Sequence, residues 1–163
     1  MTRWFLITLL LLSGGCSDLD FKVNDRVVYS PRPLFSDFEL ADPALQACVE
    51  QAVADQKVTL ARELTSLNCS HAGISSLEGL ELFTGLQQLK LSANEIRNLA
   101  PLGKLSLLET LYLDNNQVVD PVPLYELLSL KTLDLAGNGS LQCPAGNALF
   151  RLDDLSLPRH CAR

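Results

Sequence analysis

The sequence predicts an α/β solenoid, in which short parallel strands line one face and tight, irregular returns line the other. Two observations carry this prediction. Leucine recurs every 22 positions and each time opens the same pattern of Leu, two residues, Leu, one residue and an apolar residue, at Leu64, Leu86, Leu108 and Leu130. Within each unit the apolar spacing then changes. A unit of this length cannot bury its own apolar face and must stack on its neighbours.

Each unit is predicted to hold one strand, a turn and a helical return. In the second unit Leu89 and Leu91 alternate with polar residues and therefore share one side of a strand. Apolar residues then come at every third position, at Ile96, Leu99, Leu102 and Leu105. Because side chains three residues apart eclipse in a 3₁₀ helix, this spacing favours a 3₁₀-like return over an α-helix.

The turn of three units carries an asparagine, at Asn94, Asn116 and Asn138. An amide side chain has two donors and an acceptor, so it can pair backbone groups that a tight turn would leave unsatisfied. We therefore expect these repeat asparagines to bond to buried backbone groups above and below them. Pro101 and Pro123 share another column, where the return begins and where a proline is tolerated.

The four units resemble the leucine-rich repeat, and their length with a proline-leucine pair in the return is similar to the internalin-type or SDS22-like class. The resemblance covers roughly half of the chain and implies strands on a concave face and irregular returns on a convex face. Ala72 departs from the asparagine column in the first unit. Ser140 and Cys143 depart from apolar columns in the fourth, although terminal repeats are usually atypical.

The first residues indicate export. Residues 1–15 combine Arg3, an apolar run and small residues, as in a signal peptide, and the run is too short to span a bilayer. The segment ending at Cys16 resembles the bacterial lipobox, which implies a lipidated Cys16 and a membrane anchor in the cell envelope. Ser17 follows where many inner-membrane lipoproteins have Asp, so we expect the outer membrane. The alternative is a plain signal peptide that leaves Cys16 as a stray thiol.

The remaining cysteines are even in number, which suits an oxidising compartment. Four cysteines permit three pairings, and the repeat register favours Cys48 with Cys69 and Cys143 with Cys161. The second bridge would close a loop and stabilise the end of the stack by roughly 3 kcal/mol. The alternative is that these are buried free cysteines.

The predicted organisation has five parts. After the signal, residues 16–38 form a tether and an extended segment that lies on the solenoid, or alternatively serves as an aromatic docking strip. Residues 39–63 form a capping helix, with Asp42 as the N-cap and Pro43 in the first turn. This helix is similar to the cap that precedes leucine-rich repeats in bacterial surface proteins. The repeats occupy residues 64–142, and residues 143–163 form a C-terminal cap.

Composition and motifs argue against several functions. The net charge of −6, with no basic cluster or phosphate-binding loop, argues against nucleic acid as a partner. His71 and His160 are the two histidines, and neither has the sequence context of a catalytic triad or a metal site. We therefore expect no catalytic residues, no metal and no cofactor.

What the sequence offers is a surface of outward-facing strand residues. We expect Lys90, Tyr112 and Asp134 to stand side by side on neighbouring strands. The predicted protein-binding residues of this concave face are Gln88, Lys90, Tyr112, Asp114 and Asp134. The leading hypothesis is a monomeric, non-enzymatic lipoprotein that binds another protein there. The alternatives are a merely solvated polar face, and a structural spacer or assembly factor of the envelope with contacts through the N-terminal aromatic strip. A third class, an enzyme, would require an unrecognised site outside the repeats.

Overall fold

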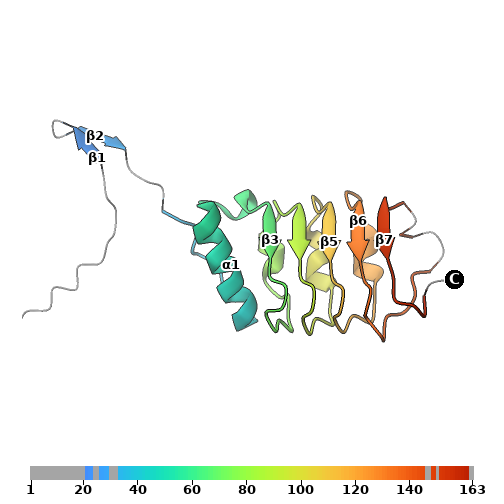
Figure 1. Cartoon of the computed structure of the whole chain (residues 1–163). Helices are drawn as coiled ribbons and strands as arrows, with labels where there is room; N and C mark the ends of the chain where they lie inside the picture. Colours follow the sequence, from blue (N-terminus) through green and yellow to red (C-terminus); the bar gives the residue numbers. More distant parts are fainter. Residues whose placement is uncertain (1–20, 24–25, 30–32, 146–147, 150, 162–163) are drawn as a thin grey trace, which may run out of the picture. The chain divides into compact units, whose positions relative to one another are not determined.

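The computed structural model describes residues 21–23, 26–29, 33–145, 148–149 and 151–161 (Figure 1). The chain divides into two units, Met1–Pro33 and Leu34–Arg163. The predicted signal segment and the predicted lipidation site, Cys16, lie outside the described residues.

The first unit contains an antiparallel pair of strands, β1 (Phe21–Val23) and β2 (Arg26–Tyr29). Phe21 pairs with Tyr29 and Val23 with Arg26, and the register shifts between Phe21 and Lys22. Residues 21–23 and 26–29 are thus extended, and they pair with each other, a contact that the prediction of an extended segment over residues 16–38 does not include.

The second unit begins with an extended segment that covers part of the repeat core. Phe35 and Phe38 stack on each other and contact the edge of the fully buried Phe83. The backbone N–H of Phe35 donates to the carbonyl of Val58 at 2.9 Å. Burial of aromatic area explains why these two partly buried rings pack on their own domain.

Helix α1 (Pro43–Gln56) follows and forms the predicted cap. It begins at Asp42, whose side chain accepts from the first backbone N–H groups, and it ends at Lys57 in a left-handed conformation. Its buried residues, Leu45, Val49 and Val53, form a stripe at intervals of four. In Figure 1 the helix lies beside the first strand of the repeat sheet, which it contacts.

The repeats form a five-stranded parallel sheet in sequence order (Figure 1). Its strands are β3 (Ser66–Asn68), β4 (Gln88–Lys90), β5 (Thr110–Tyr112), β6 (Thr132–Asp134) and β7 (Asp154–Ser156). Residues 22 apart pair across every ladder, as the repeat predicts. The fold is therefore the expected α/β solenoid with a helical cap.

Strand β7 corrects the predicted boundary between repeats and cap. The sequence predicts that the repeats end at residue 142, but β6 pairs with β7 in the same register as the other strands. Leu152, Leu155 and Leu157 repeat the leucine spacing of the earlier units, and Leu152 lies 22 residues after Leu130. The predicted cap thus contains a fifth repeat strand, and the sequence carries the signal for it.

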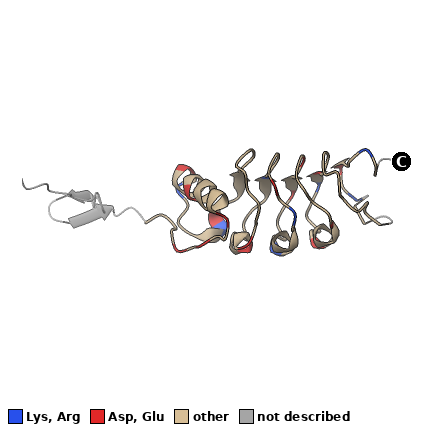
Figure 2. Cartoon of the chain, turned by 90° about the horizontal axis from the view of Figure 1, so that it is seen from below, with Lys and Arg blue, Asp and Glu red and all other residues tan. Residues whose placement is uncertain are grey.

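The returns are short 3₁₀ helices, as predicted. They are η2 (Leu80–Leu82), η3 (Ala100–Lys104) and η4 (Val122–Glu126), and a further turn, η1 (Ala61–Glu63), precedes the first strand. Pro101 and Pro123 lie at the start of η3 and η4. Figure 2 shows the strands along one side of the stack and these helices along the other. Between them lies a continuous core built largely of leucine.

Candidate functional site

The exposed side of the five strands, called here the strand face, is the predicted concave face. The middle residue of β3 to β6 is a buried leucine, and the residues on either side of it point outward. The outward residues form two columns across the sheet. The first is Ser66, Gln88, Thr110, Thr132 and Asp154, and the second is Asn68, Lys90, Tyr112, Asp134 and Ser156.

The second column contains the predicted row of Lys90, Tyr112 and Asp134. Lys90 pairs with Tyr112 in the β4–β5 ladder, and Tyr112 pairs with Asp134 in the β5–β6 ladder. The ammonium of Lys90 lies 5.5 Å from the centre of the Tyr112 ring, within the range of a cation–π contact. The repeat register thus brings these three residues together. Gln88, beside Lys90, is exposed on the same face.

The carboxylates of this face are held by short-range hydrogen bonds. Asp114 accepts from the hydroxyl of Ser92 and, through its other oxygen, from the side-chain amide of Asn115 at 2.8 Å. Asp134 accepts from the backbone N–H of Ala136 at 2.9 Å. These bonds fix both side chains to the ends of their strands, so their charges occupy defined positions.

Sequence reasoning missed a neighbouring ion pair. Lys131 and Glu109 lie one unit apart in the column just before the strands, and their charged atoms are 2.7 Å apart. The hydrogen bond and charge of Glu109 raise the pKa of Lys131 above its ordinary value. Because both side chains are largely exposed, the pair adds little to stability. The same register that aligns the strand columns could have predicted it.

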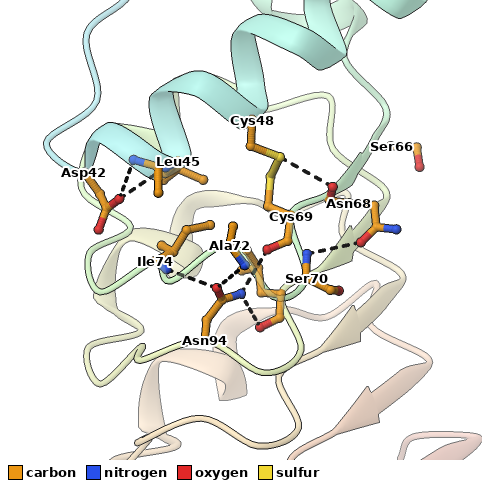
Figure 3. Close-up of a disulfide and its surroundings, with 12 residues drawn as sticks. Asp42, Leu45, Cys48, Ser66, Asn68, Cys69, Ser70, Ala72, Ile74 and Asn94 are labelled. Atoms are coloured by element: carbon orange, nitrogen blue, oxygen red, sulfur yellow. Dashed lines mark hydrogen bonds between the residues drawn. A yellow bond between two sulfur atoms is a disulfide. The ribbon is translucent and has the colours of Figure 1, made fainter.

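The repeat asparagines lie inside the stack and carry its buried hydrogen bonds. In Figure 3, the side-chain oxygen of Asn94 accepts from Ala72 and Ile74, each at 3.0 Å. Its amide nitrogen donates to the carbonyls of Cys69 and Leu91, each at 2.9 Å. Asn94 thus joins the turn of its own unit to the unit before it.

Asn116 and Asn138 repeat this arrangement. Their oxygens accept from Ile96 and Val118 of the preceding unit, and their nitrogens donate to a carbonyl of the preceding unit and to one of their own. Each of these bonds reaches backward or stays local. The expectation of partners both above and below is therefore wrong in one respect, since no asparagine side chain in the described repeats donates to the following unit.

Because these asparagine bonds reach to the preceding unit, the residues at the two ends of the asparagine column, Ala72 and His160, can differ from asparagine. Ala72 precedes every other repeat, so no earlier turn needs an amide at that position. His160 occupies the same column 22 residues after Asn138, and its Nε2 lies 2.9 Å from the carbonyl of Leu141 in the preceding unit. The histidine ring therefore makes a backward contact in the fifth unit.

The cysteines form the two pairs that the register favours. Cys48 on α1 is bonded to Cys69 at the end of β3, with 5.9 Å between their Cα atoms (Figure 3). Cys143 is bonded to Cys161, with 5.3 Å between their Cα atoms. His160 lies within 4.8 Å of both sulfurs of the second pair, but a disulfide sulfur is not a thiolate ligand. The two bridges join the helical cap and the C-terminal segment to the repeats.

No helix within the described ranges is long and apolar enough to cross a membrane.

Parallel strands, backward-reaching turn asparagines and 3₁₀ returns at a 22-residue period define a leucine-rich-repeat protein. Residues 40–148 match the family model described as the LRR domain of the endo-β-N-acetylglucosaminidase EndoS, and the chain belongs to this family. A search of curated proteins gives no significant match.

Solved structures of two internalins from Listeria monocytogenes are similar to this chain. Internalin C2 is 26% identical with a TM-score of 0.57, and the match covers 72% of this chain and 65% of that protein. Internalin InlF is 21% identical with a TM-score of 0.52, and the match covers 72% of this chain and 43% of that protein, which shows the fold alone. This chain therefore spans less than two thirds of each internalin.

Proposed function

We propose that this protein is a lipid-anchored, non-enzymatic leucine-rich-repeat protein of the bacterial envelope, and that its strand face binds another protein. The observation that carries the proposal is the row of Lys90, Tyr112 and Asp134 on three hydrogen-bonded strands. A sheet holds these side chains in fixed positions. Tyrosine adds large contact area and a hydroxyl at small entropic cost, which favours its use in binding surfaces.

The class of partner and the non-enzymatic role are proposed from the sequence and the fold. The net charge of −6 favours a protein over nucleic acid as the partner. The turn asparagines and buried leucines are accounted for by the fold, and the proposal assigns no residue to catalysis, to a metal or to a cofactor. The helix α1 covers the first strand of the sheet, which supports a monomer.

A capture experiment tests the binding face. The wild-type protein and a Tyr112→Ala, Asp134→Ala variant are used to isolate partners from the envelopes of the source organism. A Lys104→Ala, Glu126→Ala variant is the matched control, because both residues are exposed on the returns, away from the strands. We expect only the strand-face variant to lose its partners. Equal recovery by all three proteins would remove the proposal and favour a structural spacer or assembly role.

A separate experiment tests the anchor. Cys16 follows an apolar run that ends in small residues, so lipidation there would hold the protein in the outer membrane. We expect Cys16→Ser to move the protein from the membrane fraction to the soluble fraction and to remove the mass of the lipid. Unchanged mass and unchanged membrane association would reject the anchor while leaving the binding face untouched.

A further inference from the structure

We infer that the segment bound by the strand face is bipolar, with an acidic side chain over β4 and a basic side chain over β6 and β7. This inference rests on the proposed function and specifies the chemistry of the partner. It commits to a polar protein segment that crosses the strands, in a single orientation set by charge.

The charges of the two strand columns are separated along the stack, and Asp114, just beyond the end of β5, is already held by Ser92 and Asn115. Within the two columns of outward residues, the positive charge is that of Lys90 on β4. The negative charges are those of Asp134 on β6 and Asp154 on β7. Glu109 and Lys131 neutralise each other through their ion pair. A positive charge therefore lies toward the helical cap, and negative charge lies toward the C-terminal end.

Two contacts hold the central charges of this pattern in place. Lys90 lies over the ring of Tyr112, and Asp134 accepts from the backbone N–H of Ala136. Side chains that are already ordered lose less entropy on binding. Lys90 and Asp134 are thus pre-organised for a charged partner.

The same face lacks the apolar area that an amphipathic helix would need. The large hydrophobic side chains exposed in the described part of the chain lie outside both strand columns, at Leu34, Leu60, Leu82, Leu107, Val122 and Leu128. Hydroxyl, amide and charged groups dominate the columns instead. Complementary charge therefore supplies orientation and specificity for the bound segment.

The sheet also sets the spacing of charges in the partner. From β4 to β7 there are three strand spacings, or about 14 Å at about 4.8 Å each. An extended segment advances about 3.3 Å per residue, so the acidic and basic residues of the partner should be about four residues apart. This spacing distinguishes a bipolar ligand from a merely basic one.

Selection from a displayed library tests the inference even though the partner is unidentified. The probe is a library of random peptides of about twelve residues, long enough to cross the sheet when extended. Selections are run against the full chain and against a Lys90→Asp, Asp154→Lys variant, which exchanges the two charges and preserves net charge. Both residues are exposed, so the variant should fold, and its thermal melt is to be compared with that of wild type. A Lys104→Glu, Glu126→Lys exchange on the returns is the matched control.

We expect wild-type and control selections to enrich peptides with acidic and basic residues about four positions apart, and the exchanged variant to enrich the reversed order. Wild-type peptides should lose about tenfold in affinity for the exchanged variant. The enriched peptides are also measured against the Tyr112→Ala, Asp134→Ala variant. Peptides that lose affinity for that variant but bind the exchanged variant as tightly as wild type would overturn the inference and leave the proposed function standing. Peptides that bind both variants as tightly as wild type, or no enriched peptide at all, would count against both.

Discussion

The carboxylate of Asp42 accepts a hydrogen bond from the backbone N–H of Ser75, 33 residues later in the sequence and 2.8 Å away. Its other oxygen caps α1 by accepting from Ala44 and Leu45. The N–H of Ser76 and the hydroxyl of Ser75 complete the set of donors. One buried side chain therefore fastens the helical cap to the first repeat.

Asp42→Asn should test this fastening. An amide can accept with one oxygen only, so its nitrogen would face backbone donors at one of the two sites. We expect a loss of about 1–3 kcal/mol in the free energy of unfolding, measured by chemical denaturation. Asp37→Asn is the control, because Asp37 is exposed and lies in the same region of sequence. Equal effects of the two changes would show that the fastening contributes nothing.

The same carboxylate should make the free energy of unfolding depend on pH in the acid range. Burial raises the pKa of Asp42, but hydrogen bonds from Ser75, Leu45 and Ser76 outweigh burial and hold the pKa below its ordinary value. The contribution is complete above the unfolded pKa of about 3.9 and is lost as the pH falls through the folded pKa. The difference in the free energy of unfolding between wild type and Asp42→Asn should therefore shrink as the pH falls below about 4. A constant difference between the two proteins down to about pH 2 would contradict this.

Asn116→Leu should destabilise the stack. The carbonyls of Leu91 and Leu113 would each keep a bond from a neighbouring asparagine, but the N–H of Ile96 would lose its acceptor. With the added bulk, we expect a loss of about 2–4 kcal/mol in thermal or chemical unfolding.

Gln117→Leu is the matched control for Asn116, because its side chain is exposed, and it should cost little. Asn115 is unsuitable, since its φ of 55° lies in the left-handed region, where a leucine would add strain. If Asn116→Leu and Gln117→Leu melt at the same temperature, the buried role of the asparagine is refuted.

Gly85→Ala should disrupt the junction between the cap and the repeats. A Cβ at this position would overlap the backbone carbonyl of Arg62 in η1, and backbone cannot rotate away as a side chain can. We expect a loss of about 3 kcal/mol or more. Gly103→Ala is the control, because the nearest atom would be 3.6 Å away, and it should be neutral or slightly stabilising. Differential scanning calorimetry of the two variants decides the matter.

The Cys48–Cys69 bridge should protect α1 in particular. Replacing both cysteines by alanine should cost about 3 kcal/mol through the added freedom of the unfolded chain. Hydrogen exchange of the α1 amides should accelerate, because the helix loses its covalent link to β3 and then depends on non-covalent contacts such as those of Asp42 and Gln56. The corresponding change at Cys143 and Cys161 should leave α1 exchange as it is. Acceleration of α1 exchange by both changes would mean that the stack opens as one unit.

The repeat allows most of the fold to be predicted, because a single register fixes which residues share a column. The row of Lys90, Tyr112 and Asp134 follows from counting in steps of 22, and so does the pairing of Glu109 with Lys131. The fifth strand escapes the prediction because the last unit has His160 in place of the asparagine that identifies a turn. Its three leucines are enough to place β7.

Contacts outside the register cannot be predicted in the same way. The N-cap role of Asp42 is local and visible in sequence, but its second set of donors depends on how α1 docks against the first return. The strand pair of β1 and β2 is a short-range feature whose apolar pattern also suits an extended chain. The carboxylate of Asp114 is predicted to face a partner, whereas the side-chain amide of its sequence neighbour Asn115 already donates to it.

The backward reach of the asparagines gives the stack an order of completion. A ribosome delivers the chain from its N-terminus, so the N–H of Ile96 has emerged well before Asn116 can accept from it. In each newly made repeat a turn N–H lacks its asparagine acceptor until the next repeat is synthesised. The cap and the first repeat, by contrast, are joined early by the Asp42 bonds. Deleting the last repeat should therefore destabilise the repeat before it, whereas an added repeat should supply an acceptor to the repeat that precedes it.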